Sequence, residues 1–226
     1  MARSSWWAVV LLFGFSYSLL EATAETKFFC GMPDQVNGTI AHRGSFLHYD
    51  GTLHIGTLYS FFNGTDGYLR WPVDKLDDMS YTFLTSGRVP MEDLRTAVAN
   101  AFSTWEEHSV FLFREADLNE DADIEIGVYD GYHGDNIPFD GRGGIFAHGS
   151  KPADGFLHFD NAEDWSTNPT GIQVDLESVA LHEIGHILGL GHSDNDWAIM
   201  GRYFGYGRTK KTLTDDDIKG IQALYD

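Results

Sequence analysis

With 226 residues, of which 42% are hydrophobic, the chain is long enough to bury the core of one domain and too short for two full ones. Its formal net charge of −19 argues against nucleic acid or an anionic membrane as a partner, because either would need a basic face. Acidic side chains also bind hard cations, so calcium held by oxygen-rich loops would offset part of the repulsion among them.

The first residues have the pattern of a secretory signal. Arg3 precedes an apolar run over residues 6–20, and the small residues Ala22-Thr23-Ala24 follow as a cleavage site. A membrane anchor is the alternative, but the run is short and is interrupted by glycine and serine. We therefore predict a signal peptide over residues 1–24, a secreted protein, and no membrane span in the mature chain.

Residues 25–67 are rich in Gly, Asn, Thr and His and show little periodicity, which predicts a loop-rich leader. Asn37 and Asn63 each begin an Asn-Gly-Thr acceptor sequence, which a secreted glycoprotein could use on exposed loops. The leader also contains the single cysteine of the chain, Cys30. Such a cysteine could bind a metal, pair with another molecule or stay buried, and the leader alone does not choose among these.

From Trp71 the pattern tightens into that of a folded domain, to which we assign residues 68–226. A helix is predicted after Pro90, because apolar residues from Leu94 to Trp105 recur at helical spacing. Strands are predicted over residues 79–84, 110–113 and 124–128.

The segment 130–165 is predicted to be mostly loop, dense in Gly, Asp and His, with short apolar pieces over residues 144–147 and 156–159. A loop of this length without a core is either disordered or held by something else, and we expect metals to hold it. Near the end of the chain, Thr214 is predicted to cap a last helix over residues 215–224.

The strongest motif lies on a helix that Asp175 is predicted to cap and that runs through Leu188. Its residues are His182-Glu183-Ile184-Gly185-His186-Ile187-Leu188-Gly189-Leu190-Gly191-His192. Residues four apart lie on one face of a helix, so His182 and His186 can present their imidazoles to one metal ion. A left-handed turn at Gly189 would bring His192 round as the third ligand. Three neutral nitrogens suit zinc and leave its fourth position open.

Glu183 follows the first ligand, close enough to reach a water on the metal without being a ligand itself. Zinc lowers the pKa of its bound water to about 7, so Glu183 could take a proton as the water attacks a carbonyl and pass it to the leaving amine. A structural zinc in a non-catalytic binding module is one alternative, although such sites normally close with four protein ligands. A hydrolase of small amides is another.

The long histidine motif resembles that of the metzincins, and specifically that of the matrixins or matrix metalloproteinases. Met200, within Ala198-Ile199-Met200-Gly201, matches the methionine of the family's Met-turn, and Leu213 to Gln222 is similar to the family's final helix. The resemblance covers the chain from about Trp71 to its end. It implies an α+β fold with a twisted, mostly parallel five-stranded sheet, an antiparallel edge strand, three helices and metal-stabilised loops.

The same resemblance implies a secreted metalloendopeptidase that acts on extended polypeptides of the extracellular matrix. We expect a monomer, with proteinaceous metalloprotease inhibitors as further partners. We also expect a short form without a hemopexin-like domain. Residues 144–147 resemble the edge strand that pairs with substrate backbone. Arg202 stands where the family commonly has a proline in the wall of its main specificity pocket.

The resemblance also assigns ligands to the long loop. It implies a structural zinc held by His133, Asp135, His148 and His158. It implies a calcium ion held by the side chains of Asp140, Asp160 and Glu163 and by the carbonyls of Gly141, Gly143 and Ile145; a solvated acidic loop is the alternative. A second calcium stays open, because Asp123 matches one of its ligands while Phe156 stands where the acidic partner belongs.

The segment Phe29-Cys30-Gly31-Met32-Pro33-Asp34 resembles the family's cysteine switch, in which a leader thiolate takes the fourth position on the zinc. The family has arginine before the cysteine, where this chain has Phe29. The resemblance implies a latent precursor held by Cys30, with a propeptide over residues 25–67 that another protease or self-cleavage removes. A spare thiol or an intermolecular disulfide remains the alternative for Cys30.

Overall fold

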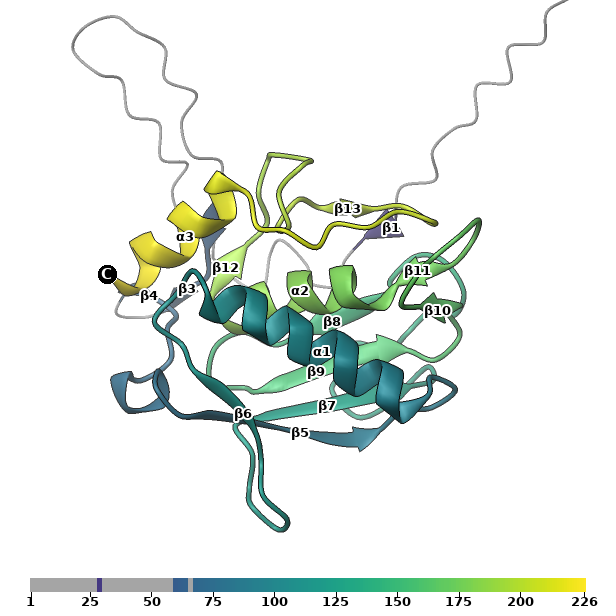
Figure 1. The fold of residues 1–226 in the computed structure, drawn as a ribbon, viewed down its shortest axis with the longest axis horizontal. Helices are drawn as coiled ribbons and strands as arrows, with labels where there is room; N and C mark the ends of the chain where they lie inside the picture. Colours follow the sequence, from purple (N-terminus) through teal and green to yellow (C-terminus); the bar gives the residue numbers. More distant parts are fainter. Residues whose placement is uncertain (1–27, 30–58, 65–66) are drawn as a thin grey trace, which may run out of the picture.

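The computed structural model describes residues 28–29, 59–64 and 67–226 (Figure 1). The predicted signal peptide, Cys30 and Asn37 lie outside the described residues. No helix in the described ranges is both long enough and apolar enough to cross a membrane.

A five-stranded sheet forms one layer of the fold, with the strand order β6-β5-β7-β9-β8. The pairs β5–β6, β5–β7 and β7–β9 are parallel, and β8 is antiparallel to β9 at the edge of the sheet. The strands are β5 (Met79–Thr85), β6 (Phe113–Glu115), β7 (Ile124–Tyr129), β8 (Ala147–Gly149) and β9 (Phe156–Asp160). This arrangement confirms the predicted α+β fold with its mostly parallel sheet and antiparallel edge strand.

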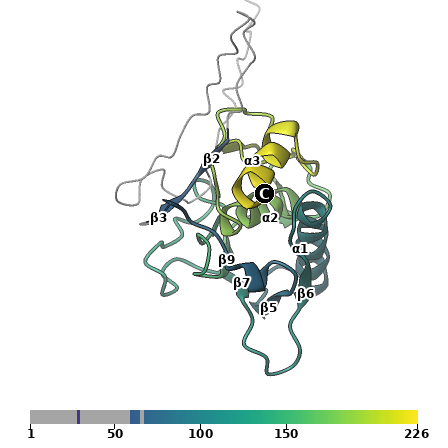
Figure 2. The same ribbon diagram turned by 90° about the vertical axis from the view of Figure 1, so that its left-hand side faces the viewer.

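Three α-helices occur in the described part of the chain: α1 (Met91–Glu106), α2 (Leu176–Ile187) and α3 (Asp215–Tyr225). Figures 1 and 2 show α1 and α2 on the same face of the sheet, with α3 near the end of α2. The predicted apolar positions of α1, from Leu94 to Trp105, are buried. The Trp105 indole donates a hydrogen bond to the carbonyl of Leu181 at 2.9 Å, which ties α1 to α2 within the core.

Short strands and one 3₁₀ helix fasten the rest of the described chain to this core. They are β1 (Phe28–Phe29), β2 (Ser60–Phe61), β3 (Asn63–Gly64), β4 (Gly67–Tyr68), η1 (Val73–Lys75), β10 (Trp165–Ser166), β11 (Val174–Asp175), β12 (Leu190–Gly191) and β13 (Tyr203–Phe204). The antiparallel pairs are β1–β13, β2–β12 and β3–β4, and β10–β11 is parallel. Two of these pairs join leader residues to the histidine motif and its surroundings.

Three strand predictions need correction. The strand expected over residues 110–113 begins only at Phe113. Leu112 bonds at the start of β5 instead: its N–H donates to the carbonyl of Leu76, and its carbonyl accepts from the N–H of Met79. The edge strand expected over residues 144–147 is found at Ala147–Gly149, because Gly144 has a φ of +74° and turns the chain. The apolar piece over residues 156–159 is the strand β9, which lies inside the sheet between β7 and β8.

Candidate metal centres

The helix α2 places the first two histidines of the motif. Asp175 caps it as predicted, since its Oδ1 accepts a hydrogen bond from the N–H of Ser178 at 2.8 Å. His182 and His186 lie on one face and are fully buried. The chain then turns at Gly189, with a φ of +107°. A Cβ on that residue would come within 2.8 Å of a backbone carbonyl oxygen, so the turn requires glycine.

The turn brings the three predicted zinc ligands together. The ligand atoms of His182, His186 and His192 all lie within 4.8 Å of one another. The Nδ1 atom of His182 lies 2.6 Å from the carbonyl oxygen of Ile199, and that of His186 lies 2.8 Å from the carbonyl oxygen of Leu190. A carbonyl only accepts, so each Nδ1 carries the proton and each Nε2 carries a lone pair.

The distance between the ring nitrogens favours a bound cation. The Nε2 atoms of His182 and His186 are 3.1 Å apart, and two lone pairs at that distance repel unless a positive ion lies between them. Burial and the neighbouring imidazoles hold the pKa of His182 well below its usual value, which favours the neutral, metal-binding form. The residues present therefore fit a zinc ion bound by three nitrogens.

Glu183 lies between this cluster and the edge of the sheet. Its side chain is buried, and its Oε2 accepts a hydrogen bond from the backbone N–H of Gly149, in β8, at 2.8 Å. A Cβ on Gly149 would lie 2.4 Å from the carbonyl oxygen of Glu183. The edge strand thus lies directly against α2 at the residue predicted to act as the base.

Met200 packs against the helix of the histidine cluster. Its side chain is 1% exposed, and its Sδ would be 2.3 Å from a Cβ on Gly185, so the methionine lies directly against α2 between His182 and His186 in the sequence. The backbone N–H groups of Ile199 and Met200 donate to the carboxylate of Asp217 at 3.0 and 2.9 Å. The sequence interpretation did not single out Asp217. The sequence feature that could have identified Asp217 is the Thr214–Asp217 capping box, in which the same carboxylate caps α3.

The four residues predicted to bind a structural zinc also form a cluster. The Oδ2 atom of Asp135 lies 2.8 Å from His133 Nε2, 2.6 Å from His148 Nε2 and 2.8 Å from His158 Nδ1. His148 and His158 are cross-strand partners in β8 and β9. Burial lowers the pKa of His148 to about 4, against the opposing effect of Asp135. One carboxylate and three imidazoles are a donor set that fits tetrahedral zinc.

The predicted calcium ligands gather less closely. Asp160 and Glu163 are buried, each with one carboxylate oxygen that no hydrogen-bond donor reaches. Burial raises the pKa of both carboxyl groups, and the charge of Asp140 adds to the effect. Glu163 accepts a hydrogen bond from the N–H of Gly143, and Asp140 accepts one from Ile145 at 3.1 Å. These three carboxylates form no third cluster of side-chain ligand atoms among the described residues, although their buried oxygens suit a hard cation.

Asp123 has a cationic partner from this chain. Its carboxylate forms an ion pair with the ammonium group of Lys75, and one oxygen accepts hydrogen bonds from the N–H and the hydroxyl of Ser80, each at 3.0 Å. The side chain of Asp123 is only 10% exposed. Lys75 thus supplies positive charge at Asp123, the residue that matches a ligand of the family's second calcium ion.

The segment after Met200 forms a wall beside the histidine cluster. Arg202 lies there with its Nη2 4.0 Å from the carboxylate of Asp194, and β13 follows. The Phe204 ring meets the His182 imidazole edge to face at 5.1 Å between ring centres. The leader strand β1 pairs with β13, with Phe28 opposite Phe204 and Phe29 opposite Tyr203. The residue before Cys30 therefore lies next to this wall.

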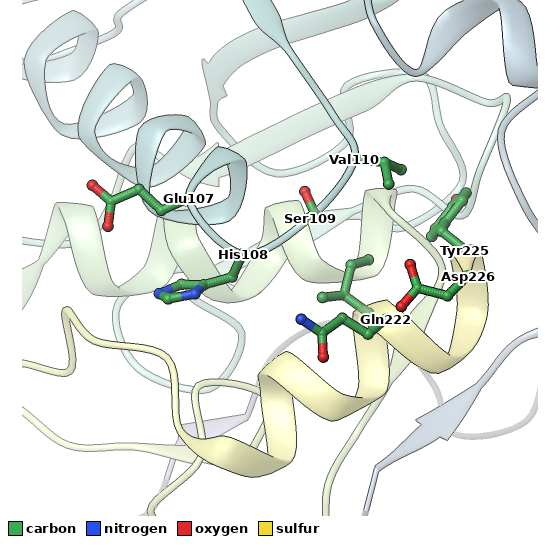
Figure 3. Close-up of a pocket in the computed structure, with 8 residues that line it drawn as sticks. Glu107, His108, Ser109, Val110, Gln222, Tyr225 and Asp226 are labelled. Atoms are coloured by element: carbon green, nitrogen blue, oxygen red, sulfur yellow. The ribbon is translucent and has the colours of Figure 1, made fainter.

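A separate cavity of about 280 Å³ lies between the end of α1 and α3. Figure 3 shows its polar lining, to which Glu107, His108 and Gln222 contribute. It includes none of the histidines of the two clusters, so we do not assign the predicted chemistry to it.

Comparisons with known proteins agree on one family. A family model described as Matrixin matches residues 70–226. The chain is 40% identical to Metalloendoproteinase 5-MMP of Arabidopsis thaliana over 205 residues, which cover 87% of this chain and 54% of that protein. It is 37% identical to Metalloendoproteinase 1 of Glycine max over 204 residues, covering 87% of this chain and 62% of that protein. It is 34% identical to human Matrix metalloproteinase-16 over 211 residues, covering 87% of this chain and 31% of that protein. The chain spans about half the length of the first of these relatives.

Proposed function

The chain belongs to the matrixin family, and from that premise we propose that it is a zinc-dependent endopeptidase in which Glu183 is the general base. The observation that carries the proposal is the meeting of three imidazoles with the Glu183 carboxylate beside the edge strand of the sheet. When bound, zinc would polarise the substrate carbonyl and lower the pKa of a water to about 7.

Residues of the chain bind the metal and transfer the proton. His182, His186 and His192 hold the metal through nitrogen atoms whose tautomer is set by backbone carbonyls for the first two. The Glu183 carboxylate accepts the proton of the attacking water and returns it to the leaving amine. The N–H of Gly149 holds that carboxylate at 2.8 Å, so its orientation is set before substrate arrives.

The substrate class follows from the position of β8. This strand is the edge of the sheet, and it lies against α2 at Glu183. An extended polypeptide can add to such an edge through backbone hydrogen bonds, which leaves side-chain preference to pockets. We therefore propose extended proteins of the extracellular matrix as substrates, in line with the predicted secretion and N-glycosylation. Proteinaceous metalloprotease inhibitors would occupy the same edge, and we propose that the enzyme is a monomer.

We assign a structural zinc to His133, Asp135, His148 and His158, because three ring nitrogens and one carboxylate converge there. We assign one calcium ion to the side chains of Asp140, Asp160 and Glu163, with the carbonyls of Gly141, Gly143 and Ile145. The buried oxygens of Asp160 and Glu163 support this assignment. The ion pair between Asp123 and Lys75 supports a single calcium ion.

Latency is the remaining part of the proposal. We propose that residues 1–24 are a signal peptide and that the leader of residues 25–67 carries the latch, with Cys30 as the fourth zinc ligand of the precursor. The pairing of β1 with β13 supports this, because β13 contacts His182 through Phe204. Because Phe29 replaces the arginine that the family has before the cysteine, support for the latch comes from the pairing of β1 with β13.

The test is cleavage of an unstructured protein by processed enzyme. We expect a chelator to abolish cleavage and zinc to restore it. A Glu183→Gln variant should retain its zinc and lose roughly 10²–10⁴-fold in kcat/KM, the usual contribution of a general base. Glu125→Gln is the matched control, because Glu125 is exposed on β7 and should leave kcat/KM at the parental value. Cleavage of small amides alone, or a fully active Glu183→Gln protein, would overturn the proposal.

A further inference from the structure

The turn that carries the third histidine has little rigidity of its own. Gly189 and Gly191 flank Leu190 between His186 and His192. Glycine loses more conformational freedom on folding than any other residue, so this turn is costly to order. The position of the His192 imidazole therefore depends on what packs against the turn.

Leader residues 59–62 pack against it. The strand β2 pairs antiparallel with β12, with Ser60 opposite Gly191 and Phe61 opposite Leu190. The hydroxyl of Ser60 donates a hydrogen bond to the carbonyl of His192 at 2.7 Å. The N–H of Phe62 donates to the carbonyl of Gly189 at 3.3 Å. Each residue from Gly189 to His192 is thus contacted by the leader.

Besides His192, residues of β2 and its neighbour Phe62 also influence the predicted ligand His186. Leu190, which β2 pairs with, offers its carbonyl to the Nδ1 atom of His186 at 2.8 Å. The Phe62 ring lies 5.7 Å from the His186 imidazole, centre to centre. Hydrogen bonds around a metal site orient its ligand rings and raise their basicity. The pairing of β2 with β12 is therefore in a position to set metal affinity.

The other side of β2 is anchored to the body of the domain. A Cβ on Gly220 of α3 would lie 3.1 Å from the Cβ of Tyr59, so Tyr59 lies close against that helix. Figure 2 shows β2 beside α3. The ring of Phe61 lies 5.3 Å from that of Tyr59 and 4.8 Å from that of Tyr68. The strand is thus held between α3 and the metal-binding turn.

We propose that residues 59–62 are a positioning strand of the catalytic metal site, and that their pairing with β12 and the hydrogen bond from Ser60 to the His192 carbonyl set the affinity of this site for zinc. That the site is catalytic rests on the proposed function, whereas the effect of the strand on metal affinity does not.

The first experiment measures zinc affinity in the full chain by competition with a chromophoric chelator. Ser60→Ala removes the hydrogen bond to the His192 carbonyl, and we expect the Kd of one of the two bound zinc ions to rise about 10- to 100-fold. Ser109→Ala is the matched control, because the Ser109 hydroxyl also donates to a backbone carbonyl at 2.7 Å, at the distant end of α1. Ser60→Thr keeps the hydroxyl and should keep the parental Kd.

A Ser60→Ala protein with the parental zinc Kd, or one that loses both zinc ions equally, would overturn the positioning role. The second experiment asks whether the zinc-loaded parent cleaves an unstructured protein. Weakened zinc binding in Ser60→Ala, together with a parent that cleaves no protein, would refute the proposed function and leave the positioning strand intact.

Discussion

At the scale of single residues, backbone carbonyls determine which ring nitrogen two of the proposed zinc ligands present to the metal site. Ile199 and Leu190 each accept from the Nδ1 atom of a histidine of α2, which leaves Nε2 facing the cluster. In the second cluster, the carbonyl of Gly131 has the same relation to His133 Nδ1, at 2.8 Å. Burial favours neutral imidazoles at both sites. Both sites are therefore prepared for a metal before it binds.

The depressed pKa of His148 predicts acid sensitivity of the metal-free protein. Its pKa falls from 6.5 to about 4 on folding, so the unfolded chain takes up the proton first and stability is lost as the pH falls through this window. We expect this residue alone to lower the free energy of unfolding by about 2 kcal/mol between pH 7 and pH 5. Urea unfolding at both pH values measures it.

His148→Phe is the comparison variant, because the imidazole stacks on Phe139 at 4.8 Å and an aromatic ring fits the site. The variant should lose most of the additional destabilisation at pH 5. An equal pH dependence in the parent and in His148→Phe would show that this histidine does not carry the effect.

At the scale of elements, the edge strand β8 connects the two proposed metal centres. Successive residues of a strand point to opposite faces, so His148 turns to the structural cluster while the neighbouring Gly149 approaches α2. The N–H of Gly149 then reaches Glu183. A metal bound at the structural site would thus order the same strand that orients the proposed base and receives the substrate.

The loop before β8 yields a prediction about calcium. Its ion would relieve the buried carboxylates of Asp160 and Glu163, so saturating calcium, at about 100 times Kd, should stabilise the domain by about 3 kcal/mol. For a domain of this size, that corresponds to a rise in Tm of about 5–10 °C. Glu163→Gln should reduce the rise to less than half, and Glu125→Gln, exposed on β7, should leave it unchanged. The same rise in the parent and in Glu163→Gln would exclude Glu163 as a ligand.

The elements that sequence patterns predicted are those set by local rules. The helix α2 follows from an Asp175 cap and a run of helix-compatible residues, and the place of the histidines follows from the period of the helix. The edge strand lies later in the chain than predicted. Glycines with positive φ, such as Gly144, turn the chain where the apolar residues predicted an extended segment. The strand β9 was missed because it lies in a segment predicted to be mostly loop. A short apolar run alone does not reveal which strands will flank it.

Contacts between distant residues were beyond the sequence patterns. The ion pair of Asp123 with Lys75 depends on the position of η1 beside the sheet. The hold of Asp217 on the Met-turn and the pairing of β2 with β12 join segments far apart in the chain. Periodicity contains no information on such pairs. The spacing of the histidine motif predicted the three ligands of the first site, and the family resemblance supplied those of the other sites. The contacts that position these residues emerged only from the structure.

At the scale of the whole molecule, residues from the two ends of the predicted catalytic domain meet at the C-terminal end of α2. The Trp71 indole donates to the carbonyl of Ile187 at 2.8 Å, and the Tyr225 hydroxyl donates to that of Leu188 at 2.8 Å. These carbonyls end the helix, where backbone acceptors lack helical partners. The leader strand β2 and the last helix α3 then enclose the turn that follows. The turn from Gly189 to His192 is therefore stabilised by residues from across the sequence.

The most direct test of the central claim is X-ray absorption at the zinc edge, before and after removal of the latch. Zn–S bonds of about 2.3 Å differ clearly from Zn–N bonds of about 2.0–2.1 Å. The latent chain should show sulfur from Cys30 on one of its two zinc ions. The activated enzyme should show no sulfur and, at the site of His182, His186 and His192, three nitrogens with one exchangeable oxygen. An activated enzyme that holds no metal at these histidines, or that keeps a fourth protein ligand there, would contradict the account.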